Sequence, residues 1–183
     1  MATKFILHGG FANHINTYND SFFKEILKDT QNNPKVLLVY FAKELDRIVV
    51  NKKEDVGQFE RNKENKNISF EVADEKSFVE QVKTADIVYL HGGNTLKLLE
   101  TLKKFENLEK LFEGKIVAGE SAGAYVLSSF FYSKKVGGIF QGFGFVPIKT
   151  ICHYTGEDLE KFPDNSKLET LLLQDYQYQI FLK

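Results

Sequence analysis

Short apolar runs alternate along the chain with segments whose apolar positions recur every three or four residues. Strands are predicted at residues 4–8, 35–42, 68–73, 86–91 and 115–119, and helices at 21–28, 44–62, 75–83, 95–105 and 122–130. The run Val36-Leu37-Leu38-Val39 has no polar position, which is typical of a strand covered on both faces. This alternation predicts an α/β fold, with a doubly wound, mainly parallel sheet and helices on both faces.

The last third of the chain has a different pattern. Residues 136–145 are rich in glycine and aromatic side chains, and they predict one or two short strands or a hairpin. The segment 166–173 predicts a helix, and 176–182 predicts a closing strand. Because no linker, repeat or low-complexity stretch is visible, we expect residues 1–183 to form a single domain.

Composition narrows the classes of partner. Of the 183 residues, 43% are hydrophobic and 27% are charged, as in ordinary globular proteins. The formal net charge of -1 gives no electrostatic reason to expect nucleic acid or a membrane as partner. With a single cysteine, no signal-peptide pattern and no apolar run near the ~20 residues that cross a bilayer, we expect a cytoplasmic protein.

One turn carries the strongest chemical signal. The mainly apolar run 115–118 leads into Gly119-Glu120-Ser121-Ala122-Gly123, where small residues begin a helix. A Gly-x-Ser-x-Gly sequence between a strand and a helix is the pattern of a nucleophile elbow. Glycine is needed on both sides of the serine because a Cβ would crowd the neighbouring strand or helix. The pattern predicts that Ser121 is a nucleophile; the alternative is a structural serine in a tight turn.

A second glycine-rich turn follows another predicted strand, at His91-Gly92-Gly93-Asn94-Thr95. Its glycines allow backbone amides to face a cleft, and Asn94 or Thr95 can cap the next helix. In a hydrolase such a loop supplies one oxyanion donor, while the residue after the nucleophile supplies the other. The alternative is a plain strand-to-helix turn. A similar His8-Gly9-Gly10 sequence ends the first strand and is expected to shape the floor of the same cleft.

The candidate base comes from four histidines, His8, His14, His91 and His153. The order of nucleophile before base favours His153, which lies in a short apolar run that could end at the sheet edge. It would take the Ser121 proton and return it to a leaving amine, unless it is a structural histidine. A metal site built from the four histidines is also conceivable, although no His-x-His or His-x3-His spacing supports it.

Two further residues lie next to these candidates. Cys152 is interpreted as a small core residue and not as a nucleophile. Glu120 places a carboxylate beside Ser121, where it could repel an oxyanion, contact a substrate amine or face away.

The motifs together resemble peptidase family S51, which includes dipeptidase E (aspartyl dipeptidase) and cyanophycinase-like enzymes. The Gly-x-Ser-Ala-Gly-Ala turn at 119–124, the Gly-Gly-Asn-Thr-x-x-Leu-Leu pattern at 92–99, the Gly-x-Gly-x-x-Pro segment at 142–147 and the pair His153-Tyr154 carry the resemblance in order. It implies a flavodoxin-like fold related to the class I glutamine amidotransferases. It also implies a Ser121–His153 pair, oxyanion donors at the Gly93 and Ala122 amides, and neither a metal nor an organic cofactor.

Two departures from the family pattern limit this resemblance. The family triad has an acid between serine and histidine, but no Asp or Glu lies between Ser121 and His153. Aspartyl dipeptidases resemble one another in gripping the substrate aspartate with an arginine beyond the histidine, whereas both arginines of this chain, Arg47 and Arg61, lie upstream. Aspartate specificity is therefore not expected. The candidates for orienting the imidazole or binding substrate are Glu120, Gln141, Glu157, Asp158, Gly92 and Asn94, with a backbone carbonyl as a further orienting group.

The sequence thus predicts a dipeptidase-like serine peptidase whose partner is a small peptide substrate. One alternative is a catalytically weak family member that binds peptides or a partner protein through the same cleft. Another is a hydrolase of a non-peptide amide or ester, which an elbow equally permits. Monomer and homodimer both remain open.

Overall fold

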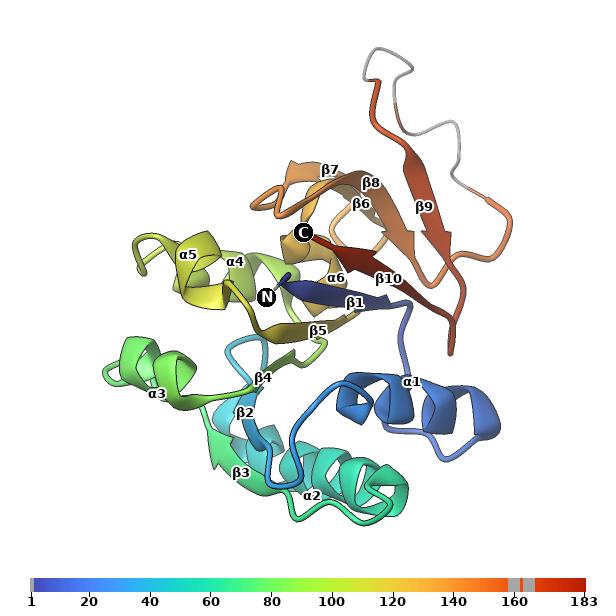
Figure 1. Ribbon diagram of the computed structural model, residues 1–183. Helices are drawn as coiled ribbons and strands as arrows, with labels where there is room; N and C mark the ends of the chain where they lie inside the picture. Colours follow the sequence, from blue (N-terminus) through green and yellow to red (C-terminus); the bar gives the residue numbers. More distant parts are fainter. Residues whose placement is uncertain (1, 158–161, 163–166) are drawn as a thin grey trace.

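The main sheet has the strand order β10-β1-β5-β4-β2-β3 (Figure 1). The computed structural model describes residues 2–157, 162 and 167–183. The strands of this sheet are β1 (Lys4–His8), β2 (Lys35–Val39), β3 (Ser69–Val72), β4 (Ile87–Leu90), β5 (Ile116–Glu120) and β10 (Tyr178–Leu182). Strands β1 to β5 pair in parallel, whereas β10 runs antiparallel to β1. The carboxyl ends of the parallel strands therefore share one edge, where sites form in such sheets.

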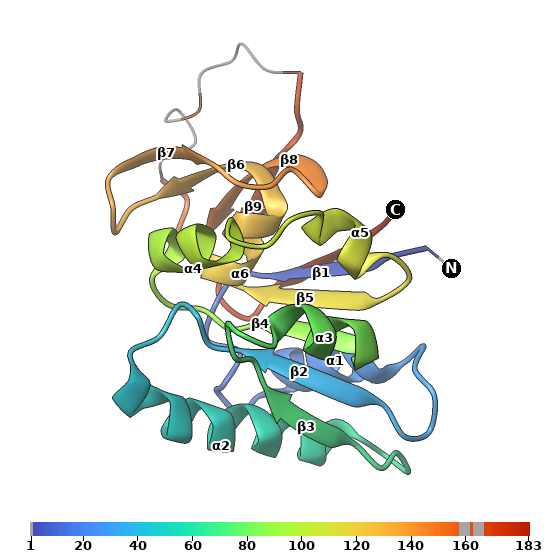
Figure 2. The ribbon, with the colours of Figure 1, turned by 90° about the vertical axis from the view of Figure 1, so that its left-hand side faces the viewer.

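Helices cover both faces of the main sheet (Figure 2). One face carries α1 (Thr17–Leu27) and α2 (Leu45–Asn62). The other carries α3 (Phe78–Thr84), α4 (Thr95–Leu102), α5 (Leu108–Phe112) and α6 (Ala122–Leu127). Successive residues of the central strands β1, β2, β4 and β5 enter opposite cores, which is why these strands are mainly apolar. The predicted α/β fold is confirmed.

A smaller sheet, of order β7-β6-β8-β9, stands beside the main one (Figure 1). Its strands are β6 (Ser128–Ser133), β7 (Gly138–Gln141), β8 (Val146–Cys152) and β9 (Thr170–Leu173). Helix α6 contacts strands of both sheets, so it joins them. Residues 136–145 contribute one short strand, β7, as expected, and it forms a hairpin with β6, which lies before that segment. Strand β8 ends at Cys152 and thereby places His153 at the edge of this sheet.

Two predicted elements differ from the structure, and one helix lies outside the prediction. The helix predicted at 122–130 ends at Leu127, because Ser128 already begins β6. The helix predicted at 166–173 is wrong where the structure describes it, since Thr170–Leu173 pair in parallel with β8. Its leucine run suits a helix locally, but the open edge of β8 decides its conformation. Helix α5 was not predicted.

Across the described residues, no helix combines the length with the apolar character that crossing a bilayer would require.

Candidate active site

Ser121 lies in a strained turn between β5 and α6. Its backbone angles are φ 48° and ψ −98°, a region that residues other than glycine rarely adopt. A Cβ on Gly119 would lie 2.5 Å from the Gly123 carbonyl carbon, and a Cβ on Gly123 would lie 2.2 Å from the Leu90 oxygen. Both glycines are therefore required by close backbone approach, as the sequence predicts. The turn has the geometry of a nucleophile elbow.

Ser121, His153 and Asp175 form a chain of hydrogen bonds. Ser121 Oγ lies 2.9 Å from His153 Nε2, and His153 Nδ1 lies 2.6 Å from Asp175 Oδ1. The His153 and Asp175 side chains are 40% and 35% exposed, so the chain of contacts lies at an open surface. When Nδ1–H donates to the Asp175 carboxylate, Nε2 is left free to accept the Ser121 proton. The arrangement can therefore generate a serine nucleophile.

The residue beside His153 Nδ1 is none of the predicted ones, which is a correction. Gln141 lies exposed on β7, and Glu157 forms an exposed ion pair with Lys134 at 3.7 Å. Asp158 falls outside the described residues. Asp175 reaches the histidine because β9 pairs with β8, so the turn that follows β9 arrives beside the residue that follows β8.

The loop after β1 holds His153 in place. The His153 amide donates to the Gly9 oxygen at 3.2 Å, and the Tyr176 amide donates to the Gly10 oxygen at 3.2 Å. A Cβ on Gly10 would lie 2.0 Å from His153 Cε1, and the φ of Gly10 is +142°. The imidazole therefore occupies the space that any larger residue would need. His153 itself has a positive φ of 54°.

The two predicted oxyanion donors are the amides of Gly93 and Ala122. Among the residues that the structure describes, neither amide donates a hydrogen bond to another group. The amide of Ser121, by contrast, donates to the His8 oxygen at 2.9 Å. The φ of Gly93 is +146°, and a Cβ there would lie 2.6 Å from the Ala42 oxygen. Asn94 accepts from the Lys97 amide at 3.1 Å and caps α4, so its side chain has the structural role that the sequence allowed.

Glu120 is buried, and its carboxylate faces backbone amides of two loops. Oε1 accepts from the Ala12 amide at 3.1 Å, and Oε2 accepts from the Gly92 amide at 3.2 Å. His91 Nδ1 lies 3.5 Å from the same Oε2. Burial alone would raise the pKa of Glu120, but the charge of His91 and the two amides outweigh it and lower the pKa.

His91 is held between two buried carboxylates. Its Nδ1 lies 2.9 Å from Asp55 Oδ2, which also accepts from the Tyr40 hydroxyl at 2.8 Å. Burial opposes protonation of His91, yet Asp55 and Glu120 together raise its pKa. Burial raises the pKa of Asp55 despite these partners. Nothing in the residue pattern predicted this cluster, since Asp55 lies on α2 and far from His91 in the chain.

The other two histidines make different contacts. His8 Nε2 lies 3.0 Å from Asn19 Oδ1, while His8 Nδ1 accepts from the Gly10 amide at 3.2 Å. Burial lowers the pKa of His8 to about 4. His14 Nδ1 contacts the Tyr176 hydroxyl at 3.2 Å. Within the described residues, no group of three or more His, Cys, Asp and Glu side chains is arranged to hold a metal ion.

These residues line a cleft of about 830 Å³ at the carboxyl ends of the strands. Its walls come from the turns after β1, β2, β4, β5, β6 and β8 and from α2, and cationic side chains lie around it at Lys43, Arg47, Lys134 and Lys135. Cys152 borders the cleft, but it is almost fully buried, and burial raises the pKa of its thiol far above the usual value. It remains a protonated core residue, as the sequence predicts.

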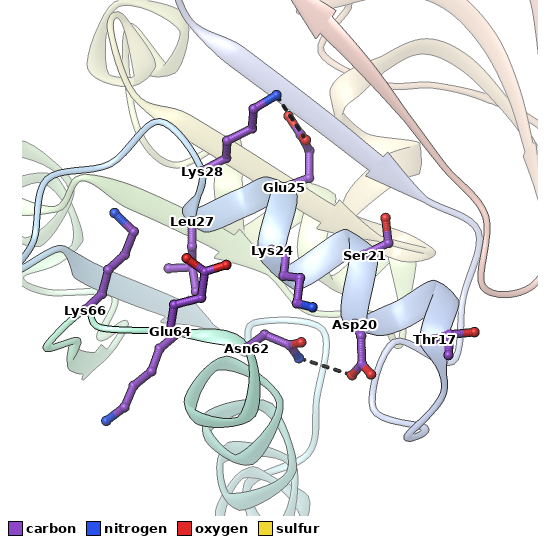
Figure 3. A pocket seen from close by; sticks show the side chains of 11 residues that line it. Thr17, Asp20, Ser21, Lys24, Glu25, Leu27, Lys28, Asn62, Glu64 and Lys66 are labelled. Atoms are coloured by element: carbon purple, nitrogen blue, oxygen red, sulfur yellow. Dashed lines mark hydrogen bonds and ion pairs between the residues drawn. The ribbon is translucent and has the colours of Figure 1, made fainter.

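A separate cavity lies between α1 and residues 62–66 (Figure 3). Two of its acids are already paired, Asp20 with Arg61 and Glu25 with Lys4. Ser21 in this cavity contacts the Tyr178 hydroxyl at 2.9 Å instead of a base. The cavity therefore lacks the nucleophile geometry found at Ser121.

The model of peptidase family S51 matches residues 5–182. A crystal structure of a peptidase from an acI-B1 Actinobacterium aligns with a TM-score of 0.74 and 22% identity, covering 99% of this chain and 84% of that one. A peptidase E-like protein from Listeria monocytogenes EGD-e aligns with a TM-score of 0.65 and 18% identity, covering 100% and 98%. At these identities the two structures support the fold alone. No curated protein matches the chain.

Proposed function

Because the chain belongs to peptidase family S51, we propose that it is a serine-type peptidase that hydrolyses short peptides. The observation that carries the proposal is the hydrogen-bonded chain Ser121–His153–Asp175 on a strained elbow. Membership of the family supports the assignment of this chain as a peptidase. We propose in addition that Ser121 is the nucleophile and that dipeptides are preferred substrates.

In the proposed reaction Ser121 Oγ attacks the carbonyl carbon of the scissile bond while His153 Nε2 takes its proton. The amides of Gly93 and Ala122 hold the negative oxygen of the tetrahedral intermediate. His153 then gives the proton to the leaving amine, and the C–N bond breaks to form an acyl-enzyme. Water, activated by the same histidine, releases the acid product. Asp175 keeps the imidazole in the correct tautomer throughout.

A catalytically weak peptide-binding protein was the alternative because no acid lies between Ser121 and His153. Asp175 removes that argument, since its carboxylate lies 2.6 Å from His153 Nδ1. Preference for short substrates is supported by the cleft, whose 830 Å³ is the size of an ordinary small-molecule site.

The proposal is tested by labelling the folded protein with a fluorophosphonate probe, which reacts only with an activated serine. We expect stoichiometric labelling at Ser121, located by peptide mass spectrometry, and none in Ser121→Ala. A dipeptide library then measures turnover, and a panel of esters and non-peptide amides is measured beside it.

Each result bears on a different part of the proposal. A wild-type protein that stays folded and unlabelled contradicts the nucleophile. Labelling with turnover of esters but of no peptide contradicts the peptide substrate and favours the non-peptide hydrolase. Turnover that persists in Ser121→Ala contradicts the mechanism.

A further inference from the structure

Glu120 is an unusual residue to find directly before a nucleophile. An anion there would repel the negative oxygen that forms when Ser121 attacks, because like charges interact strongly where water is excluded. Glu120 is nevertheless only 6% exposed, and both of its carboxylate oxygens accept hydrogen bonds. A buried carboxylate with this much support suggests a positive role.

The two engaged amides belong to the two loops that frame Ser121. Ala12 lies in the loop after β1, whose Gly9 and Gly10 contact His153. Gly92 lies in the loop after β4 and directly precedes Gly93, the proposed oxyanion donor. One carboxylate at the end of β5 therefore connects the loop of the base to the loop of the oxyanion donor.

The negative charge of Glu120 has a basic neighbour, His91, beside the same oxygen that accepts from the Gly92 amide. His91 Nδ1 lies 3.5 Å from Glu120 Oε2 and 2.9 Å from Asp55 Oδ2, which in turn accepts from the Tyr40 hydroxyl. With His91 protonated, its charge offsets that of Glu120 and lessens the repulsion of an oxyanion at Ser121. Glu120 can thus connect the two loops as an anion while a cationic partner lies beside its carboxylate.

We propose that Glu120 is a positioning residue: its carboxylate, balanced by His91, ties the Gly92 amide to the Ala12 amide and thereby fixes the Gly93 amide relative to Ser121. This rests on the proposed function. Glu120 touches no reacting atom and acts through the two loops.

The substitution Glu120→Gln tests this role because glutamine has the shape of glutamate but replaces one of its two acceptor oxygens with an NH₂ group. Both partners are N–H donors, whereas a glutamine offers one oxygen and one NH₂, so one loop must lose its contact. Removing an oxyanion donor outright costs about 10²- to 10³-fold in kcat, so displacing one is expected to cost about 10- to 100-fold. The matched control is Glu80→Gln, which makes the same change at an exposed carboxylate on α3.

The readout is the second-order rate of fluorophosphonate labelling at Ser121, expressed per folded molecule. We expect a 10- to 100-fold slower rate in Glu120→Gln and no change in Glu80→Gln. For any dipeptide that the wild type cleaves, the loss should fall on kcat, with KM within about twofold. A merely structural role would lower the melting temperature and leave both readouts unchanged.

The outcomes separate this proposal from the proposed function. An unlabelled wild type refutes both. A labelled wild type with Glu120→Gln reacting within twofold of it overturns the positioning role alone. If Glu120→Gln does not fold, amide hydrogen exchange of the wild type decides: Gly92 and Ala12 should be protected while Gly93 exchanges faster, and equal fast exchange at all three overturns the proposal.

Discussion

At the scale of single residues, the acid of the candidate triad gives the sharpest test. Asp175→Asn keeps the size of the side chain but can place an NH₂ against His153 Nδ1, which stabilises the wrong tautomer. Loss of the acid in a serine triad lowers kcat by about 10⁴-fold, and we expect a similar fall here. The measurement is turnover of a cleaved dipeptide at saturating concentration.

Glu157→Gln is the control for that substitution. It removes a carboxylate that lies even closer to His153 in the chain but that pairs with Lys134 on the surface. We expect wild-type turnover. Equal losses in the two variants, or a loss below tenfold in Asp175→Asn, would contradict the assignment of the acid.

His8 predicts a dependence of stability on pH. Its pKa is about 4 in the folded protein, against about 6.5 when unfolded. As the pH falls below about 6.5 the unfolded chain binds this proton first, so stability present above that pH is lost progressively down to about 4, by about 3 kcal/mol in total. His91, whose pKa is raised, acts in the opposite direction and above pH 6.5.

The variant His8→Gln isolates this effect, because a glutamine still offers an acceptor to Gly10 and a donor to Asn19. Urea unfolding at pH 7 and at pH 4.5 gives the loss in free energy of unfolding for each protein. We expect the loss to be about 2–3 kcal/mol smaller in the variant. Parallel losses would mean that His8 titrates normally.

The sequence predicts a site residue when the residues that identify its role are its neighbours in the chain. Ser121 is recognisable because its two glycines and its flanking strand and helix are adjacent in the chain. Asp175 is not, because it lies 22 residues from His153 and reaches it only through the pairing of β8 with β9. Asp55 and His91 meet for the same kind of reason, one on a helix and the other after a strand.

At the scale of elements, two helical glycines, one in open space and one in close backbone contact, are expected to respond oppositely to substitution by alanine. Gly57 lies inside α2 with no atom within 4 Å of its would-be Cβ, whereas Gly123 in α6 would meet the Leu90 oxygen at 2.2 Å. Gly57→Ala should stabilise by about 0.5–1 kcal/mol, because alanine favours the helix. Gly123→Ala should destabilise by about 3 kcal/mol or more, because two backbones must separate.

Chemical denaturation of the two variants against the wild type measures both effects. The sign is the test: a destabilised Gly57→Ala would contradict the open environment on α2. A Gly123→Ala protein as stable as the wild type would contradict the close approach of α6 to β4 that mounts Ser121.

The central strands β1, β2, β4 and β5 of the main sheet could be predicted because they are covered on both faces and are therefore mainly apolar. The small sheet could be predicted only in part: β7 lies in the segment where a short strand is expected, whereas the first residues of β6 and residues 170–173 of β9 read locally as helix. Residues 170–173 are the clearest case: Thr170-Leu171-Leu172-Leu173 has no periodicity that separates strand from helix, and only the neighbouring β8 decides.

At the scale of the whole molecule, the candidate site is assembled from both sheets. Ser121 and Gly93 come from the main sheet, His153 from the end of β8, and Asp175 from the turn between β9 and β10. That turn crosses from the small sheet to the main one, because β9 pairs with β8 while β10 pairs with β1. The position of the acid therefore depends on strand β10 at the edge of the main sheet.

Strand β10 allows that dependence to be tested with one substitution at two positions. Thr3 and Lys183 exchange both backbone hydrogen bonds, and Gly9 donates to the Gln177 oxygen. Because antiparallel pairs alternate, the Gln179 amide faces Leu7 on β1, and the Leu182 amide faces away from it. Gln179→Pro should thus break the pairing with β1, whereas Leu182→Pro should be tolerated at the open edge.

We expect Gln179→Pro to lower the free energy of unfolding by about 3 kcal/mol and Leu182→Pro by less than about 1 kcal/mol. Because Asp175 is carried on the turn that leads into β10, Gln179→Pro should also slow fluorophosphonate labelling of Ser121 in the molecules that remain folded. Labelling at the wild-type rate in that variant would show that β9 and the contacts of Gly9 and Gly10 hold the acid without β10. Equal destabilisation by the two prolines would contradict the register between β1 and β10.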